Sequence, residues 1–156
     1  MSDLELRRRL RTFINQAEAA WFKVYDSSLG RKVIVVRGDE YIQLPLQFSI
    51  RPKIIAFFRK YWSPAFSQVQ FCNLKSILFR GRRYVILADP GPVPNHVVSL
   101  RIICQTSTRI RVRAVLSGGS SGNVVIFYTI ARSSSNGLTI ISRTGLKNDY
   151  RFIPCK

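Results

Sequence analysis

The segment 96–143 constrains the fold most strongly, because four apolar stretches follow one another in it with short polar gaps between them. Ser, Thr, Gly or Asn fills each gap, which is typical of β-strands joined by turns. In the second stretch Arg109, Arg111 and Arg113 alternate with apolar residues. Successive side chains of a strand point to opposite faces, so this alternation predicts three guanidinium groups on one face of a sheet.

Positive charge dominates the chain and indicates a polyanionic partner. The 156 residues include 25 Lys and Arg but only 8 Asp and Glu, which gives a formal net charge of +17. This excess is larger than solubility requires of a domain of this length. Between Tyr41 and Asn148 the only acidic residue is Asp89, so the charge belongs to the folded body. Most of the basic residues are arginines, whose planar fork suits phosphate groups.

A basic amphipathic helix is predicted over 1–25. Ser2 and Glu5 have the spacing of a capping box, which starts a helix. Apolar residues then recur at helical spacing: Leu6, Leu10, Phe13, Ile14, Ala17 and Trp21. Four arginines crowd the first three turns: Arg7, Arg8, Arg9 and Arg11. They form either a solvated basic face or an arm that contacts phosphate, and the charge of the whole chain favours the arm.

The β-rich body is predicted over 32–156, and together with the helix it makes one domain, 1–156. Its predicted strands are 32–37, 41–48, 68–79, 82–88, 97–104, 109–116, 124–132 and 138–142, with a short edge strand at 150–153. A short apolar helix begins near Pro52 and ends before Pro64. Its aromatic residues favour a place in the core over a base-stacking platform. The predicted fold class is therefore mainly β (α+β), an antiparallel sheet or sandwich of about eight strands with an amphipathic N-terminal helix and a second short helix.

The three cysteines, Cys72, Cys104 and Cys155, are widely spaced and odd in number. This pattern supports neither a disulfide framework nor a thiolate metal cluster, so we expect buried free thiols. No stretch reaches the length of a membrane span, and the N-terminus lacks the apolar block of a signal peptide. We therefore expect a soluble protein of a reducing compartment, cytoplasmic or nuclear, or in a virion if the protein is viral.

The sequence does not predict an enzyme. The only histidine, His96, lies in a predicted loop, where a lone histidine is more often structural or solvated than catalytic. The acidic pair Asp39-Glu40 is typical of a hairpin turn and not of a general acid and base. The glycines form neither a phosphate-binding loop nor a dinucleotide fingerprint. The Ser/Gly loop 117–123 could offer backbone amides to an anion, but its composition favours a flexible hairpin loop. We expect no catalytic residues, no metal site and no cofactor.

Nucleic acid, either RNA or single-stranded DNA, is the polyanion we expect to bind without sequence specificity. The candidate contact residues are Arg7, Arg8, Arg9, Arg11, Arg80, Arg82, Arg83, Arg109, Arg111 and Arg113. Dispersed arginines that contact phosphates give affinity without reading sequence, and that affinity falls with salt. The group at 80–83 lies at a turn and is either a phosphate-gripping tip or an ordinary solvated turn. An anionic membrane surface is the less favoured partner, because the helix needs its apolar stripe to cover the sheet.

Two family resemblances suggest different architectures. The stretch IIAFFRKYWSPAFSQVQFCNLKSILF (54–79) resembles the element between the second and third strands of jelly-roll coat proteins of small icosahedral viruses, and GNVVIFYTIAR (122–132) resembles their last strands. This resemblance implies an antiparallel sandwich whose basic inner surface packages a genome and whose edges meet neighbouring subunits, hence a homo-oligomer.

The order of elements is similar instead to the cone-shaped fold of the nuclear transport factor 2 superfamily. A long helix, a hairpin, a short helix and then consecutive hairpins over 97–142 suit a curved sheet wrapped around the N-terminal helix. That resemblance implies a scaffold or ligand-binding module that recognises an acidic protein or a small ligand, and it fixes no function by itself. The side of the sheet that carries Arg109, Arg111 and Arg113 distinguishes the two interpretations.

Overall fold

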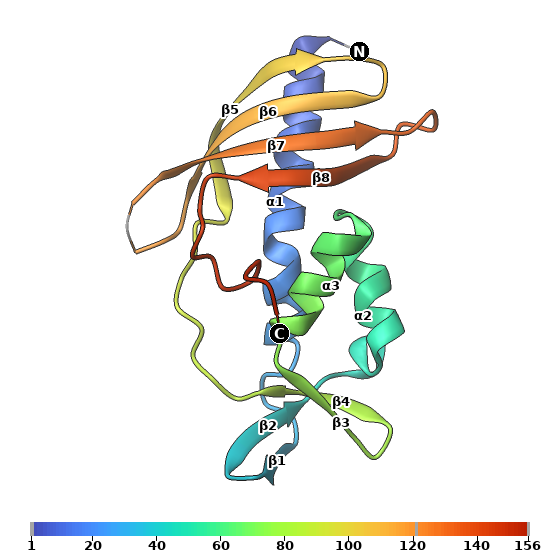
Figure 1. Cartoon of the computed structure of the whole chain (residues 1–156), viewed down its shortest axis with the longest axis vertical. Coiled ribbons are helices and arrows are strands. Elements are labelled where there is room, and N and C mark those ends of the chain that lie inside the picture. Colours follow the sequence, from blue (N-terminus) through green and yellow to red (C-terminus); the bar gives the residue numbers. More distant parts are fainter. Residues whose placement is uncertain (1, 121, 156) are drawn as a thin grey trace.

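The computed structural model describes residues 2–120 and 122–155, which form an α+β fold around one long helix (Figure 1). The helices are α1 (Asp3–Asp26), α2 (Arg51–Phe58) and α3 (Pro64–Cys72), with a single 3-10 turn, η1, at Leu46–Phe48. The strands are β1 (Val33–Val36), β2 (Asp39–Gln43), β3 (Ser76–Phe79), β4 (Arg82–Ile86), β5 (His96–Gln105), β6 (Arg109–Ser117), β7 (Val124–Arg132) and β8 (Leu138–Thr144). The predicted fold class is confirmed: these eight strands form two antiparallel four-stranded sheets.

Helix α1 begins as the sequence predicts, and its side chains pack in two hydrophobic cores. The amide of Glu5 donates to Ser2 Oγ at 3.2 Å, and the amide of Ser2 donates to Glu5 Oε2 at 3.1 Å, which completes the capping box. The N-terminal half of the buried stripe packs in one core with strands β5–β8, whereas the C-terminal half packs in a second core with α2 and the smaller sheet. Figure 1 shows β5–β8 crossing the upper part of α1 and the smaller sheet at its lower end.

The larger sheet is a meander in which β5, β6, β7 and β8 pair in chain order. Its inner residues alternate along each strand, and Ile110, Val112, Ile126 and Ile130 are fully buried against the first core. Asn136 adopts φ of +64° in the turn between β7 and β8, which agrees with the predicted hairpin. The strand pattern of 96–143 is thus confirmed, with shifts of one or two residues at the ends.

The smaller sheet has the order β1-β2-β4-β3, and here two predicted strands are partly wrong. The predicted strand 68–79 begins at Ser76, because α3 occupies Pro64–Cys72. Ser63 caps this helix by accepting from the amide of Phe66 at 3.4 Å, and Pro64 occupies its first turn. Pro64 therefore begins α3, whereas α2 has already ended at Phe58. The predicted strand 41–48 ends at Gln43, and η1 follows it.

The C-terminal segment is tied to α3, and the prediction of buried free thiols is wrong. Cys72 and Cys155 form a disulfide with Cα atoms 6.2 Å apart, and Cys104 is exposed. Asn73 Nδ2 donates to the carbonyl oxygens of Arg151 and Ile153 at 3.0 and 2.8 Å, so the tail lies along the end of α3 and is not the predicted edge strand. The expected reducing compartment rested on free thiols, and the disulfide removes that support. No helix in the described part of the chain is long and apolar enough to cross a membrane.

Candidate nucleic-acid interface

The outer face of the β5–β8 sheet carries the three alternating arginines. Arg109 and Arg111 are exposed and Arg113 is half-buried, whereas Ile110 and Val112 between them are fully buried on the inner face. In Figure 1 α1 lies behind this sheet, on the inner side. The period-two pattern therefore places guanidinium groups on the surface and not in an enclosed hollow.

Arg101 joins this face, although sequence reasoning did not select it. It is exposed on β5 and lies directly opposite Arg113 of β6, while its neighbours Leu100 and Ile102 pack against the first core. The same alternation of basic and apolar residues could have identified it. Side chains of directly opposite residues lie about 4.5–5.5 Å apart at Cβ, where like charges destabilise the pair. We call Arg101, Arg109, Arg111 and Arg113 the arginine face.

No member of the arginine face forms an ion pair in the part of the chain that the structure describes. The ion pairs found there all involve Arg143 or Arg151, which lie elsewhere. Four cations held on one open sheet surface without a carboxylate partner attract mobile anions or a polyanion. The arginine face is therefore the candidate interface.

The arginines of α1 line three surface pockets. Arg7 lines a pocket of about 380 Å³ with Arg101 and Asp3, so the helix contributes to the edge of the arginine face at β5. Arg8 and Arg9 line another pocket, of about 520 Å³, beside the turn that joins β7 to β8. Arg9 is held there by a hydrogen bond from its guanidinium to the carbonyl oxygen of Asn136. Arg11 is exposed on the same helix as Arg7 and Arg8, and all three line a third pocket.

The predicted group Arg80, Arg82 and Arg83 lies on the β3–β4 hairpin of the other sheet, apart from the arginine face (Figure 1). Arg80 stacks on Phe79 at 5.3 Å, and Arg82 donates to the carbonyl oxygen of Leu44 at 3.2 Å. Arg83 lies 5.3 Å from the ring of Phe71, as does Arg51. Burial and then the charge of Arg51 lower the pKa of Arg83. The structure thus separates this group from the β6 arginines.

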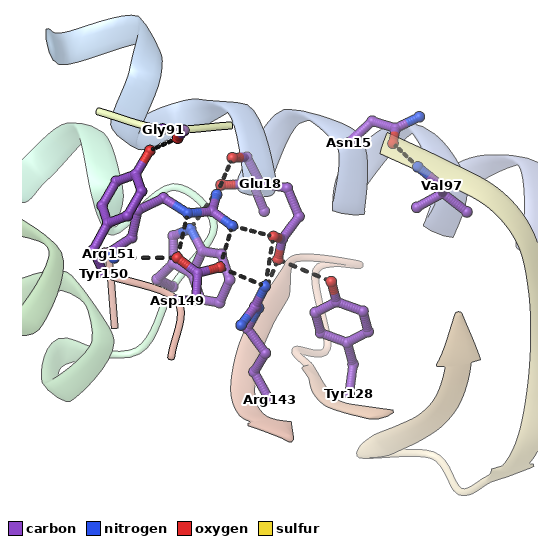
Figure 2. Close-up of polar contacts among 11 residues, drawn as sticks. Asn15, Glu18, Gly91, Val97, Tyr128, Arg143, Asp149, Tyr150 and Arg151 are labelled. Carbon is purple, nitrogen blue, oxygen red and sulfur yellow. Dashed lines mark hydrogen bonds and ion pairs between the residues drawn. The ribbon is translucent and has the colours of Figure 1, made fainter. Parts of the chain in front are cut away.

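A buried ionic cluster, which sequence reasoning missed, joins α1 to the end of the chain (Figure 2). Glu18 accepts from Arg143 at 2.9 and 3.0 Å and from Arg151 at 3.0 Å. Asp149 accepts from Arg143 at 3.3 Å and from Arg151 at 2.7 Å, and the Tyr128 hydroxyl donates to Glu18 at 2.9 Å. All four charged side chains are at most 3% exposed. Two carboxylates and two guanidiniums balance, so the cluster contributes no net charge.

The electrostatics of the cluster favour its ionised form. Burial alone would raise the pKa of Glu18, but the charges of Arg143 and Arg151 and hydrogen bonds from Arg143 and Tyr128 outweigh it and lower that pKa. Burial and the neighbouring Glu18 raise the pKa of Tyr128 well above 10, which keeps the hydroxyl protonated as a donor. Such a satisfied cluster positions the tail against α1.

Acid should destabilise the protein through Glu18. Its folded pKa lies below the ordinary value of 4.5, so its stabilisation is fully present above about pH 4.5 and is lost as the pH falls through the folded pKa. We expect the free energy of unfolding from urea titrations to stay level above about pH 4.5 and to fall as the pH is lowered further. Glu18→Gln should flatten this dependence, whereas an equally steep profile in that variant would contradict the assignment.

No protein-family model matches the sequence, and a search of curated proteins gave no significant match. Within the described residues no group of three or more His, Cys, Asp or Glu side chains could hold a metal ion.

Proposed function

We propose that the protein is a non-enzymatic structural protein that binds nucleic acid through the arginine face. The observation that supports the proposal is the placement of Arg101, Arg109, Arg111 and Arg113 on one open sheet surface without a carboxylate partner. A phosphate backbone supplies the missing charge at each guanidinium, and it relieves the repulsion between Arg101 and Arg113. Contacts with phosphate contribute affinity but do not distinguish one base from another, so binding does not depend on the nucleotide sequence.

The arginine face would also allow several copies of the protein to bind side by side along one nucleic-acid strand. Arg109, Arg111 and Arg113 follow one another along β6 at about 6.6–6.8 Å per alternate residue, which forms a row of charges. Arg7 extends the row around the β5 edge, where it shares a pocket with Arg101. A homo-oligomer would place several such rows along one polyanion, the arrangement that a coat-type protein requires.

Removing the β6 arginines should weaken nucleic-acid binding and its salt dependence. For Arg109→Gln, Arg111→Gln and Arg113→Gln combined, we expect log K against log salt to become less steep by about 2, since each lost phosphate contact removes about 0.7 on a single strand. The measurement is fluorescence anisotropy of a labelled oligonucleotide over a salt series from low to physiological concentration.

A matched triple variant distinguishes the effect of the position of the three charges from the effect of the protein's total charge. Arg31→Gln, Lys32→Gln and Arg37→Gln remove the same charge from exposed positions around β1, and we expect them to leave the slope nearly unchanged. Equal losses in both triples would assign binding to net charge and not to the arginine face. A wild-type protein that binds no more tightly at low salt than at high salt would overturn the proposal.

A second candidate function, recognition of an acidic protein by a cone-type scaffold, is supported by the chain-order pairing of β5–β8 around α1. The space between helix and sheet is filled by side chains such as Leu10, Ile14 and Val112, so such a partner would also bind outside. Competition distinguishes the candidates: polyglutamate that displaces the oligonucleotide at equal charge concentration favours the acidic protein. Light scattering with the ultraviolet absorbance ratio of purified material tests oligomerisation and bound nucleic acid together.

A further inference from the structure

An aromatic side chain lies in the same row as two members of the arginine face. Phe127 of β7 is directly opposite Arg113 of β6, which is itself opposite Arg101 of β5. Directly opposite residues share one face of a sheet, and the chain neighbours of Phe127, Ile126 and Tyr128, are buried on the inner face. Phe127 therefore points to the outer face.

Phe127 does not belong to either hydrophobic core of the described residues, and it is half-buried, not covered. The other aromatic residue of this sheet, Tyr128, is 1% exposed and donates to Glu18. By contrast, Phe58 and Trp62, which belong to the aromatic segment after Pro52, are fully buried. Phe127 is thus the aromatic ring that this sheet presents beside its arginines.

We propose that the arginine face binds single strands in preference to duplexes, with Phe127 as a stacking platform for an unpaired base. This inference rests on the proposed function and restricts its ligand from nucleic acid in general to single strands. In a duplex the faces of the bases are covered by their neighbours, whereas an unpaired strand can turn a base onto an aromatic ring. Base stacking on aromatic side chains tolerates any sequence, in keeping with phosphate contacts from Arg113, which lies next to Phe127 in the row, and from Arg101 beyond it.

The test compares a single-stranded oligonucleotide with a duplex of the same length, using the full chain. Phe127→Ala should weaken binding of the single strand about tenfold, which is about 1.4 kcal/mol, and leave duplex affinity unchanged. Phe79→Ala is the matched control, because Phe79 is also half-buried beside an arginine, Arg80, but lies on the other sheet. That control should leave both affinities unchanged.

A second measurement on the wild-type protein keeps the test independent of how the variant folds. A single strand carrying 5-iodouridine, crosslinked by ultraviolet light and digested with trypsin, should label the peptide 114–132 that contains Phe127. Labelling confined to other peptides would overturn the inference.

The outcomes separate this inference from the proposed function. If Phe127→Ala weakens both ligands equally or neither of them, stacking is wrong, although the arginine face still binds phosphate. If the wild-type protein binds neither single strand nor duplex, the proposed function fails and this inference fails with it.

Discussion

Glu18→Gln is expected to lower the free energy of unfolding by about 3–5 kcal/mol, because removing one partner from a buried ion cluster leaves charge uncompensated. Arg143 and Arg151, which are 3% and 0% exposed, would then share only Asp149. The amide keeps the shape of the carboxylate, so the loss reports charge and not packing. Urea unfolding followed by the fluorescence of Trp21 and Trp62 measures the change.

Glu40→Gln is the control for the loss of a negative charge, since Glu40 is exposed on β2. We expect this variant to change the free energy of unfolding by less than about 0.5 kcal/mol. A Glu18→Gln protein as stable as Glu40→Gln would mean that the ionised carboxylate does not hold the tail against α1.

Replacing Cys72 and Cys155 together with Ser is expected to destabilise the protein by about 4–5 kcal/mol, because the disulfide closes a long loop in the unfolded chain. The two residues are 83 positions apart. The same loss should appear when the wild-type protein is reduced, and thermal or urea unfolding under oxidising and reducing conditions measures it.

Cys104→Ser is the matched control, because that thiol is exposed and free. It should leave unfolding unchanged in either condition. Titration of thiols in the oxidised, denatured wild-type protein should find one free group. Three free groups would contradict the disulfide, and a double variant as stable as Cys104→Ser would show that Asn73 and the ionic cluster hold the tail without it.

Local patterns predicted the elements whose structure depends on nearby residues. The capping box of Ser2 and Glu5 and the apolar stripe behind it start and orient α1, and both are confirmed. The alternation around Arg109–Arg113 placed the arginines opposite a buried apolar face, as the burial of β6 confirms. Arg101 obeys the same rule and could have been predicted with them. The nucleic-acid interface built on these residues stays a prediction.

The segment 64–72 shows where local patterns were insufficient. A serine before a proline can cap a helix, but aromatic and polar residues in this segment also fit a strand. Packing decided the outcome, since Phe66 of α3 contacts Trp62 and Phe152, with ring centroids 5.3 and 6.0 Å apart.

By itself the sequence determined α1, the four strands of 96–143, the excess of charge and the alternation that puts the β6 arginines on one side of their strand, because each follows from the spacing of residues close together in the chain. The pairing of β5–β8 in chain order and the exposure of the arginine side came from the tertiary structure. Only the tertiary structure decided the pairing of Cys72 with Cys155, the ionic cluster of Glu18 with Arg151, and the meeting of Arg101, Arg113 and Phe127 in one row. Those contacts join residues far apart in the chain, and their energies depend on distances that exist only once both cores have formed.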